Sequence, residues 1–230
     1  MELSLSEDDL VAYISKQLNA FYPDNKPVTD GIKKSVNNAI QRLEYCFKHV
    51  AYKRYCNEGN THYNHLYSDH NILLLWYLAN SIWTESGNEN LASKLYYLNK
   101  SLHGFDCMYD TQMPDIFLVF HGVGTMLGKA SYSNFFVALQ GCTVGSHKGN
   151  YPVFGNGVAL TANSSVIGNC NIGDRVSIGA KALVFEKNIE SDHSVFINSN
   201  TGATDVKISG TAYAQQFFNV DLKNYSSPVS

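Results

Sequence analysis

The chain has 230 residues, a hydrophobic content of 44% and a formal net charge of −3 at pH 7. These values exclude global disorder and predict one large or two small folded domains. The slight negative charge argues against nucleic acid as the main partner, because phosphate binding usually requires a basic surface. No apolar run reaches the roughly 18 residues of a membrane span, and the acidic start MELSLSEDDL lacks a signal-peptide pattern. A cytoplasmic protein is therefore expected.

Residues 1–103 carry the signals of α-helices. Apolar residues recur at spacings of three and four behind polar residues suited to cap a helix. These predicted caps are Ser6, Thr29 with Asp30, Asp69 and Asn88. Polar connections separate the predicted helices at 57–68 and 84–88. The pattern predicts an α-helical N-terminal domain over residues 1–103.

From about residue 120 the helical period disappears and a period of six replaces it. The downstream series of apolar positions is Phe154, Leu160, Val166, Ile172, Ile178 and Val184. The upstream series is Phe120, Met126, Tyr132, Ala138 and Val144. The two series are out of phase, which predicts four extra residues looped out within GSHKGNYP.

A period of six is typical of a triangular coil with one hexapeptide on each face. The apolar residue of each hexapeptide points inward, and the coils stack through parallel strand pairing. The alternative, a β-sandwich, predicts strands every 8–12 residues with a period of two, which fits less well. We predict an α+β fold, in which a left-handed parallel β-helix over residues 104–200 follows the helical domain and a C-terminal tail spans 201–230.

Two segments resemble the hexapeptide-repeat acyltransferases of the serine acetyltransferase-like branch, as found with bacterial capsule and O-antigen synthesis. They are residues 120–146, FHGVGTMLGKASYSNFFVALQGCTVGS, and residues 151–184, YPVFGNGVALTANSSVIGNCNIGDRVSIGAKALV. The resemblance implies an acetyl-CoA-dependent acyltransferase. It also implies a homotrimer with the cofactor groove between neighbouring β-helices; a hexamer is the larger alternative.

His121 matches the family's general base, and Asp106, fifteen residues before it, matches the aspartate that supports that base. A hydroxyl becomes a competent nucleophile only when a base removes its proton during attack on the thioester. A carboxylate on the second ring nitrogen would fix the tautomer and stabilise the imidazolium. The alternative is that His121 is a hydrogen-bonded structural residue of the coil.

The resemblance also implies binding residues. Gly145 and Ala162 match contacts to the pantetheine arm of CoA, and Lys181 is a candidate for its 3′-phosphate. The family's Arg-His-Pro, which holds serine, is replaced here by Asn150, Tyr151 and Pro152. Because a guanidinium is the natural partner of a carboxylate, this loss favours a neutral acceptor.

We therefore expect an O-acetyltransferase acting on a small hydroxyl acceptor, a sugar or surface-polysaccharide precursor, contacted by Asn150, Tyr151 and His147. The alternatives are serine O-acetyltransferase, N-acetylation of an amino sugar, and a non-catalytic β-helix scaffold. A zinc enzyme of the carbonic anhydrase type is disfavoured by the histidine spacing, and no metal is expected. Four polar residues form a further cluster: His62, His65, Asp69 and His70. The sequence allows three interpretations of it: a metal site, a contact to the acceptor, or loop and helix-cap residues without a functional role.

Overall fold

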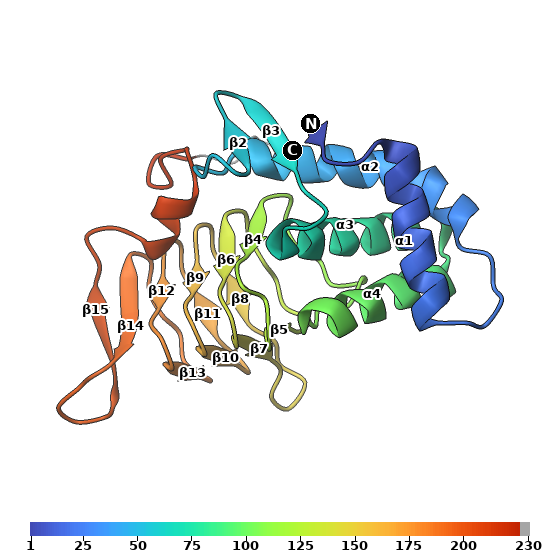
Figure 1. Cartoon of the computed structure of the whole chain (residues 1–230). Coiled ribbons are helices and arrows are strands. Elements are labelled where there is room, and N and C mark those ends of the chain that lie inside the picture. Colours follow the sequence, from blue (N-terminus) through green and yellow to red (C-terminus); the bar gives the residue numbers. More distant parts are fainter. Residues whose placement is uncertain (226–230) are drawn as a thin grey trace.

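The computed structural model describes residues 1–225 and has a helical part beside a stack of β-coils (Figure 1). The predicted α+β fold is confirmed. The four helices are α1 (Glu7–Phe21), α2 (Thr29–Lys48), α3 (Ser68–Ser86) and α4 (Glu89–His103). Helix α3 runs between α2 and α4 and is buried without a break from Asp69 to Ala79. A helix that is apolar all round is typical of the centre of a bundle.

Two of the predicted helix caps are confirmed and two are wrong. Ser6 Oγ accepts a hydrogen bond from the backbone N–H of Asp9 at 3.2 Å, and Asn88 Oδ1 accepts one from Leu91 at 3.1 Å. Thr29 is instead the first residue of α2, and its hydroxyl donates to Ser15. Helix α3 begins before Asp69, at Ser68, and has no side-chain cap.

A small sheet covers the start of the helical part. Strand β1 (Glu2–Leu3) pairs in parallel with β3 (Asn60–Tyr63), which pairs antiparallel with β2 (Cys56–Asn57). All of the β2–β3 hairpin except Cys56 lies within residues 57–68, which the sequence predicts as a polar connection.

Three sheets form the faces of the β-coil stack, as the hexapeptide period predicts. The first sheet contains β4 (Phe117–Val119), β6 (Phe136–Ala138), β9 (Ala159–Leu160), β12 (Ser177–Ile178) and β14 (His193–Ile197), in that order. The second contains β5 (Met126–Leu127), β7 (Thr143–Gly145), β10 (Ser165–Ile167) and β13 (Leu183–Phe185). The third contains β8 (Val153–Phe154) and β11 (Asn171–Ile172). All these pairs are parallel.

The strand registers confirm the looped-out segment. Ser165 pairs with Leu183, eighteen positions later, which is three hexapeptides. Thr143 pairs with Ser165, twenty-two positions later, so this coil holds four additional residues. They lie where His147 and Asn150 form an antiparallel bridge across a tight loop.

The interior of the stack follows the predicted period with one exception. The six downstream apolar positions are all buried, and so are four of the five upstream ones. Met126 is 49% exposed, and Leu127 is buried in its place. The reason is the register of β5, which pairs Leu127 with Val144 and so shifts the first coil by one residue. A one-residue shift in a strand exchanges its inward and outward side chains.

The segment after residue 200 is more than an extended tail. Strand β14 pairs antiparallel with β15 (Thr204–Ile208), so residue 200 lies in the turn of a hairpin. Residues 209–225, the C-terminal hook, then return along the coils through the short 3₁₀ helix η1 (Tyr213–Phe217). The hook reaches the end of α2, where Ala51 N–H donates to the Phe217 carbonyl at 2.9 Å.

Candidate functional site

His121 lies at the corner between β4 and β5, and its side chain is exposed. Its backbone has a φ of +52°, a left-handed conformation that costs a non-glycine residue about 1 kcal/mol. The backbone N–H of His121 donates to Asp69 Oδ1 at 3.0 Å. A hydrogen bond to a carboxylate contributes more than this conformational cost. Asp69, at the start of α3, therefore fixes the direction in which the His121 side chain leaves the coil.

Asp69 is a buried carboxylate. It is 1% exposed, and its Oδ2 atom has no hydrogen-bond partner within residues 1–225. Burial raises the pKa of Asp69, while the hydrogen bond and the charge of His121 oppose that rise. A buried, incompletely partnered acid beside an exposed histidine is the arrangement expected at functional sites rather than in a packed core.

The His121 side chain faces a hollow of about 510 Å³, the His121 hollow. Much of its lining is aromatic and comes from four separate parts of the chain: Tyr52, Tyr55, Tyr67, Phe120, Tyr213 and Phe217. Lys53 and Arg54 are the charged residues among the rest, and no carboxylate lines the hollow. The hollow thus combines a candidate base, aromatic walls and positive charge.

The C-terminal hook forms one wall of the His121 hollow. The ring of Phe217 lies 4.9 Å from that of Phe120 and 5.8 Å from that of Tyr52, measured between centroids. Gln215 fixes the hook internally by donating to the Val220 carbonyl at 2.8 Å and accepting from the Leu222 N–H at 2.9 Å. The end of the chain therefore helps to shape the space in front of His121.

In the structure the Asp106 carboxylate binds groups other than His121. One Asp106 oxygen accepts from the Tyr96 hydroxyl and the other from the Lys100 ammonium, each at 2.7 Å. Among residues 1–225 no hydrogen bond joins Asp106 to His121. Its backbone instead pairs with the first coil through Thr125 and Leu127. Asp106 ties α4 to the β-helix, and Asp69 is the carboxylate at His121.

The corner that carries His121 continues from coil to coil through residues 139–142, 161–164 and 179–182. Backbone hydrogen bonds link these turns, and the Lys181 N–H donates to the Ala162 carbonyl at 3.0 Å. The structure thus places Ala162 and Lys181 on the same edge as His121. Lys181 is exposed about three coil spacings from His121, or roughly 14 Å. Gly145 lies on the neighbouring face, where an added Cβ would meet only Ile167, at 3.8 Å.

The predicted acceptor contacts lie at a different corner. Asn150 and Tyr151 are exposed on the loop between β7 and β8, away from the His121 corner. His147 Nδ1 donates to Glu186 Oε1 at 2.8 Å, and its ring lies 4.9 Å from that of Phe185. One chain alone therefore does not bring these three residues to His121.

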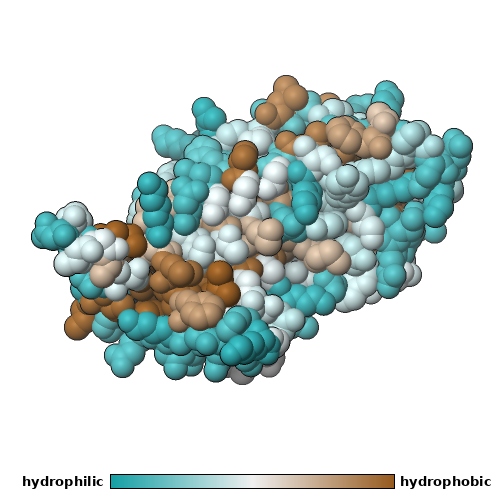
Figure 2. All heavy atoms as spheres, turned by 90° about the horizontal axis from the view of Figure 1, so that it is seen from below, coloured by the Kyte–Doolittle hydropathy of each residue, from teal (hydrophilic) through white to brown (hydrophobic). Residues whose placement is uncertain are grey.

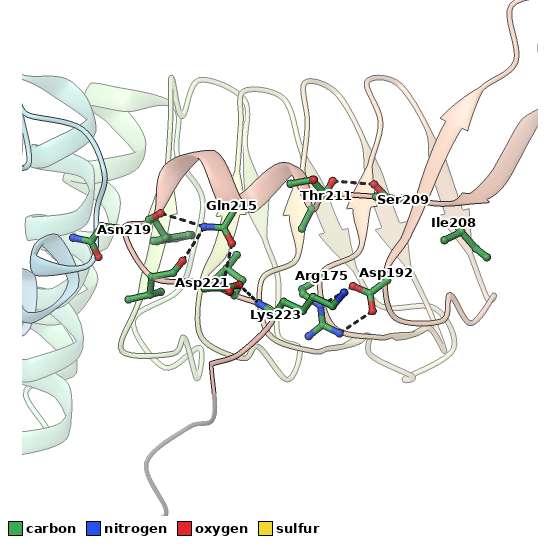
Figure 3. Close-up of a pocket in the computed structure, with 14 residues that line it drawn as sticks. Arg175, Asp192, Ile208, Ser209, Thr211, Gln215, Asn219, Asp221 and Lys223 are labelled. Atoms are coloured by element: carbon green, nitrogen blue, oxygen red, sulfur yellow. Dashed lines mark hydrogen bonds and ion pairs between the residues drawn. The ribbon is translucent and has the colours of Figure 1, made fainter.

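A second hollow, of about 730 Å³, lies between the C-terminal hook and the last coils (Figure 3). Arg175 projects into it but makes a bidentate ion pair with Asp192, at 2.7 and 2.8 Å. Lys223 is accompanied by Asp221 in the same lining. Because its charges balance, this hollow offers little attraction to an ionic ligand. No group of three or more histidine, cysteine or acidic residues suited to hold a metal occurs in the described part of the chain.

Sequence pattern misses three parts of this site. It assigns Asp69 to a helix cap, and it gives no role to residues 52–55 or to the hook. The only early signal is the polar cluster that contains Asp69, His65 and His70. In the structure His70 is buried, and burial followed by the charge of Arg54 lowers its pKa to about 3. His62 instead pairs with Glu2 at 2.8 Å.

No protein-family model matches the chain. Among curated proteins, the serine acetyltransferase of Synechococcus elongatus is 29% identical over 106 residues. That match covers 44% of this chain and 43% of that protein, so the chain spans less than half the length of the curated relative it matches.

Solved structures of serine acetyltransferases share the fold. That of Neisseria gonorrhoeae is 19% identical over 90% of this chain and 82% of its own, with a TM-score of 0.67. Isoform 3 of Entamoeba histolytica, in complex with cysteine, is 22% identical over 83% and 70%, with a TM-score of 0.57. A serine acetyltransferase in complex with CoA is 18% identical over 79% of both chains, with a TM-score of 0.62. In residues 1–225 no helix combines the length and apolar character needed to cross a membrane.

Proposed function

We propose that the chain is an acetyl-CoA-dependent O-acetyltransferase with His121 as its general base. The observation that carries the proposal is the exposed His121 side chain, held over the hollow by the buried Asp69 carboxylate. An exposed imidazole on a rigid coil is placed to take the proton of a bound hydroxyl. The sequence match and the shared fold with serine acetyltransferases support the same chemistry.

In the proposed reaction the acceptor hydroxyl gives its proton to His121 as its oxygen attacks the carbonyl carbon of the thioester. A carbon–oxygen bond forms, and the carbonyl becomes a tetrahedral oxyanion. The oxyanion then collapses, the carbon–sulfur bond breaks, and the imidazolium returns the proton to the CoA sulfur. The negative charge of Asp69 favours the imidazolium that forms between these steps.

The edge from His121 to Lys181 fits an extended acyl-CoA arm. The small side chain of Ala162 leaves room for a ligand between them, and Lys181 supplies a cation at the far end. Gly145 lies on the adjoining face, where a second chain of the proposed trimer would form the other wall of the cofactor groove. We infer that acetyl-CoA lies along this edge, with the thioester at His121 and a phosphate at Lys181.

An exposed apolar surface supports the proposed homotrimer. Figure 2 shows hydrophobic side chains gathered over the underside of the β-coils. Met126, Leu183 and Phe185 are each nearly half-exposed, and all three lie on the sheet that contains β5 and β13. Such patches mark interaction surfaces. A trimer would also let the loop of a neighbouring chain bring its Tyr151 to the site. Leu183→Lys should therefore yield monomers, as measured by light scattering.

Serine is the acceptor favoured by the similarity to serine acetyltransferases. The second candidate is a sugar or surface-polysaccharide precursor, which the neutral Asn150 and Tyr151 favour over the family's Arg-His pair. The two differ in charge, so a panel of acceptors separates them.

The test is thiol release from acetyl-CoA with serine, sugars, amino sugars and nucleotide sugars as acceptors. We expect His121→Ala to lower kcat by roughly 10²- to 10⁴-fold while CoA still binds. His193→Ala is the matched control, because His193 is a second coil histidine, and within residues 1–225 its ring hydrogen-bonds only to the Ser191 carbonyl. Full activity of His121→Ala would refute the assignment of the base, and absence of CoA binding would favour a non-catalytic scaffold.

A further inference from the structure

The His121 hollow holds positive charge that the fold itself does not use. Lys53 and Arg54 lie in the exposed connection between α2 and β2, and both line the hollow. Neither forms a salt bridge or a side-chain hydrogen bond with another residue in the part of the chain described. By contrast, Arg175 in the second hollow and Lys94 in the helical part both pair with aspartates at 2.7 Å or less.

The Arg54 guanidinium is nevertheless held in place. Its central carbon lies 5.4 Å from the centre of the Tyr67 ring, a cation–π arrangement. Stacking on a ring face leaves the N–H donors at the edge of the guanidinium free to bind a ligand. Glu2 lines an adjoining hollow with Lys53 and Arg54, but its carboxylate pairs with His62 at 2.8 Å. The buried His70 adds no further positive charge, because burial and then the charge of Arg54 lower its pKa to about 3.

We propose that Arg54, assisted by Lys53, binds an anionic group on the acceptor and so selects hydroxyl compounds that carry a carboxylate or a phosphate. This inference rests on the proposed function. The anion belongs to the acceptor rather than to CoA, because the phosphates of CoA lie at the opposite end of the pantetheine arm from the thioester. An acceptor hydroxyl at His121 leaves the rest of its molecule in the hollow, between the aromatic walls and the two cations.

The proposal also explains how the chain tolerates Asn150 and Tyr151 in place of the arginine and histidine that its resemblance leads one to expect. A cation for the acceptor is still present, but it reaches the hollow from the helical part instead of the β7–β8 loop. A neutral acceptor would leave both cations unpartnered in the bound complex. An anionic one gains a bidentate, charge-assisted pair.

The test compares acceptors that differ only in charge: glycerol, glycerate and glycerol 3-phosphate, with serine as a fourth probe. Binding is measured by calorimetry on the full-length His121→Ala chain, so that it is separate from turnover. We expect at least one anionic compound to bind more tightly than glycerol, and Arg54→Gln to weaken that binding by roughly 10- to 100-fold. Comparing the affinities of glycerate and serine with that of glycerol 3-phosphate shows whether the site prefers a carboxylate or a phosphate.

Kinetics on chains that retain His121 supply the second readout. Arg54→Gln should raise the KM of the anionic acceptor by a similar factor while the KM of acetyl-CoA stays unchanged, and Arg54→Lys should restore part of the loss. Lys34→Gln, an exposed cation on α2, is the control and should have no effect. Equal binding of neutral and anionic probes, or an Arg54→Gln chain with unaltered acceptor binding, overturns the inference. The proposed function fails separately, if His121→Ala retains its activity.

Discussion

Replacing Asp69 by asparagine tests which carboxylate supports His121. The asparagine oxygen can still accept the His121 N–H that now binds Asp69 at 3.0 Å, so only the negative charge is lost. A histidine ring nitrogen lies within about 5 Å of its own backbone nitrogen, so the carboxylate is within about 8 Å of the proton-accepting atom. At an effective dielectric constant of about 20 this separation corresponds to about 2 kcal/mol of stabilisation of the imidazolium.

Because the His121 side chain is exposed, solvent reduces this stabilisation, to about 1 kcal/mol at the lower end. The expected fall in kcat is therefore about 5- to 30-fold for Asp69→Asn, measured by thiol release at saturating acetyl-CoA and acceptor. The melting temperature should stay the same or rise. Burial raises the pKa of Asp69, so its ionised form costs folding free energy that a neutral amide avoids.

Asp106→Asn is the matched comparison and should show the opposite behaviour. It weakens the contacts with Tyr96 and Lys100, so the free energy of unfolding should fall by about 1 kcal/mol. Its kcat should remain near that of the native chain. If Asp106→Asn abolished turnover while Asp69→Asn did not, the assignment of Asp69 to His121 would be refuted.

Three further changes have defined outcomes. Burial lowers the pKa of His70 to about 3 and that of His103 to about 4, from the ordinary value of 6.5. Below pH 6.5 the unfolded chain therefore binds more protons than the folded chain, and the folded chain loses stability as the pH falls. Urea titrations should show a loss of at most about 2 kcal/mol per histidine between pH 8 and 5, and His70→Gln should remove its share. Gly122→Ala should cost about 1–3 kcal/mol in the same assay, because its Cβ would lie 2.7 Å from Ile72, whereas Gly145→Ala should be nearly neutral. Phe217→Ala should raise the acceptor KM without changing that for acetyl-CoA, because it opens one wall of the His121 hollow; an unchanged acceptor KM would exclude the hook from the site.

The fold was predictable because its signals are local and repeat. Every hexapeptide places one apolar side chain inward at the same position. The change of phase between the two apolar series was therefore enough to predict the loop of four extra residues, which the pairing of Thr143 with Ser165 confirms. The exception, Met126, has a non-local cause. Its strand takes its register from β7, and no property of the segment itself distinguishes Met126 from Leu127. Gly122 is similar, since its small size is required by Ile72 of α3 and not by the turn that contains it.

The site was less predictable because its parts come together only in the folded chain. His121 was found through a motif within one coil, but Asp69 contacts it across 52 positions of sequence. A local rule assigns an aspartate before an apolar helix to a cap, and here the tertiary contact takes that carboxylate instead. The spacing of fifteen residues between Asp106 and His121 does not join their side chains by a hydrogen bond in the described residues, because α4 supplies Tyr96 and Lys100 as partners for Asp106.

The same reasoning applies to the choice of acceptor. A missing arginine in a motif predicts a missing charge only if no other segment reaches the same space. In this chain the α2–β2 connection does reach it, and it carries Lys53 and Arg54. The net charge at the hollow, and not the residue at one aligned position, determines the free energy of binding an anion there. Loss of the loop arginine is therefore compatible with an acidic acceptor, and Arg54→Gln is the substitution that decides between an acidic and a neutral one.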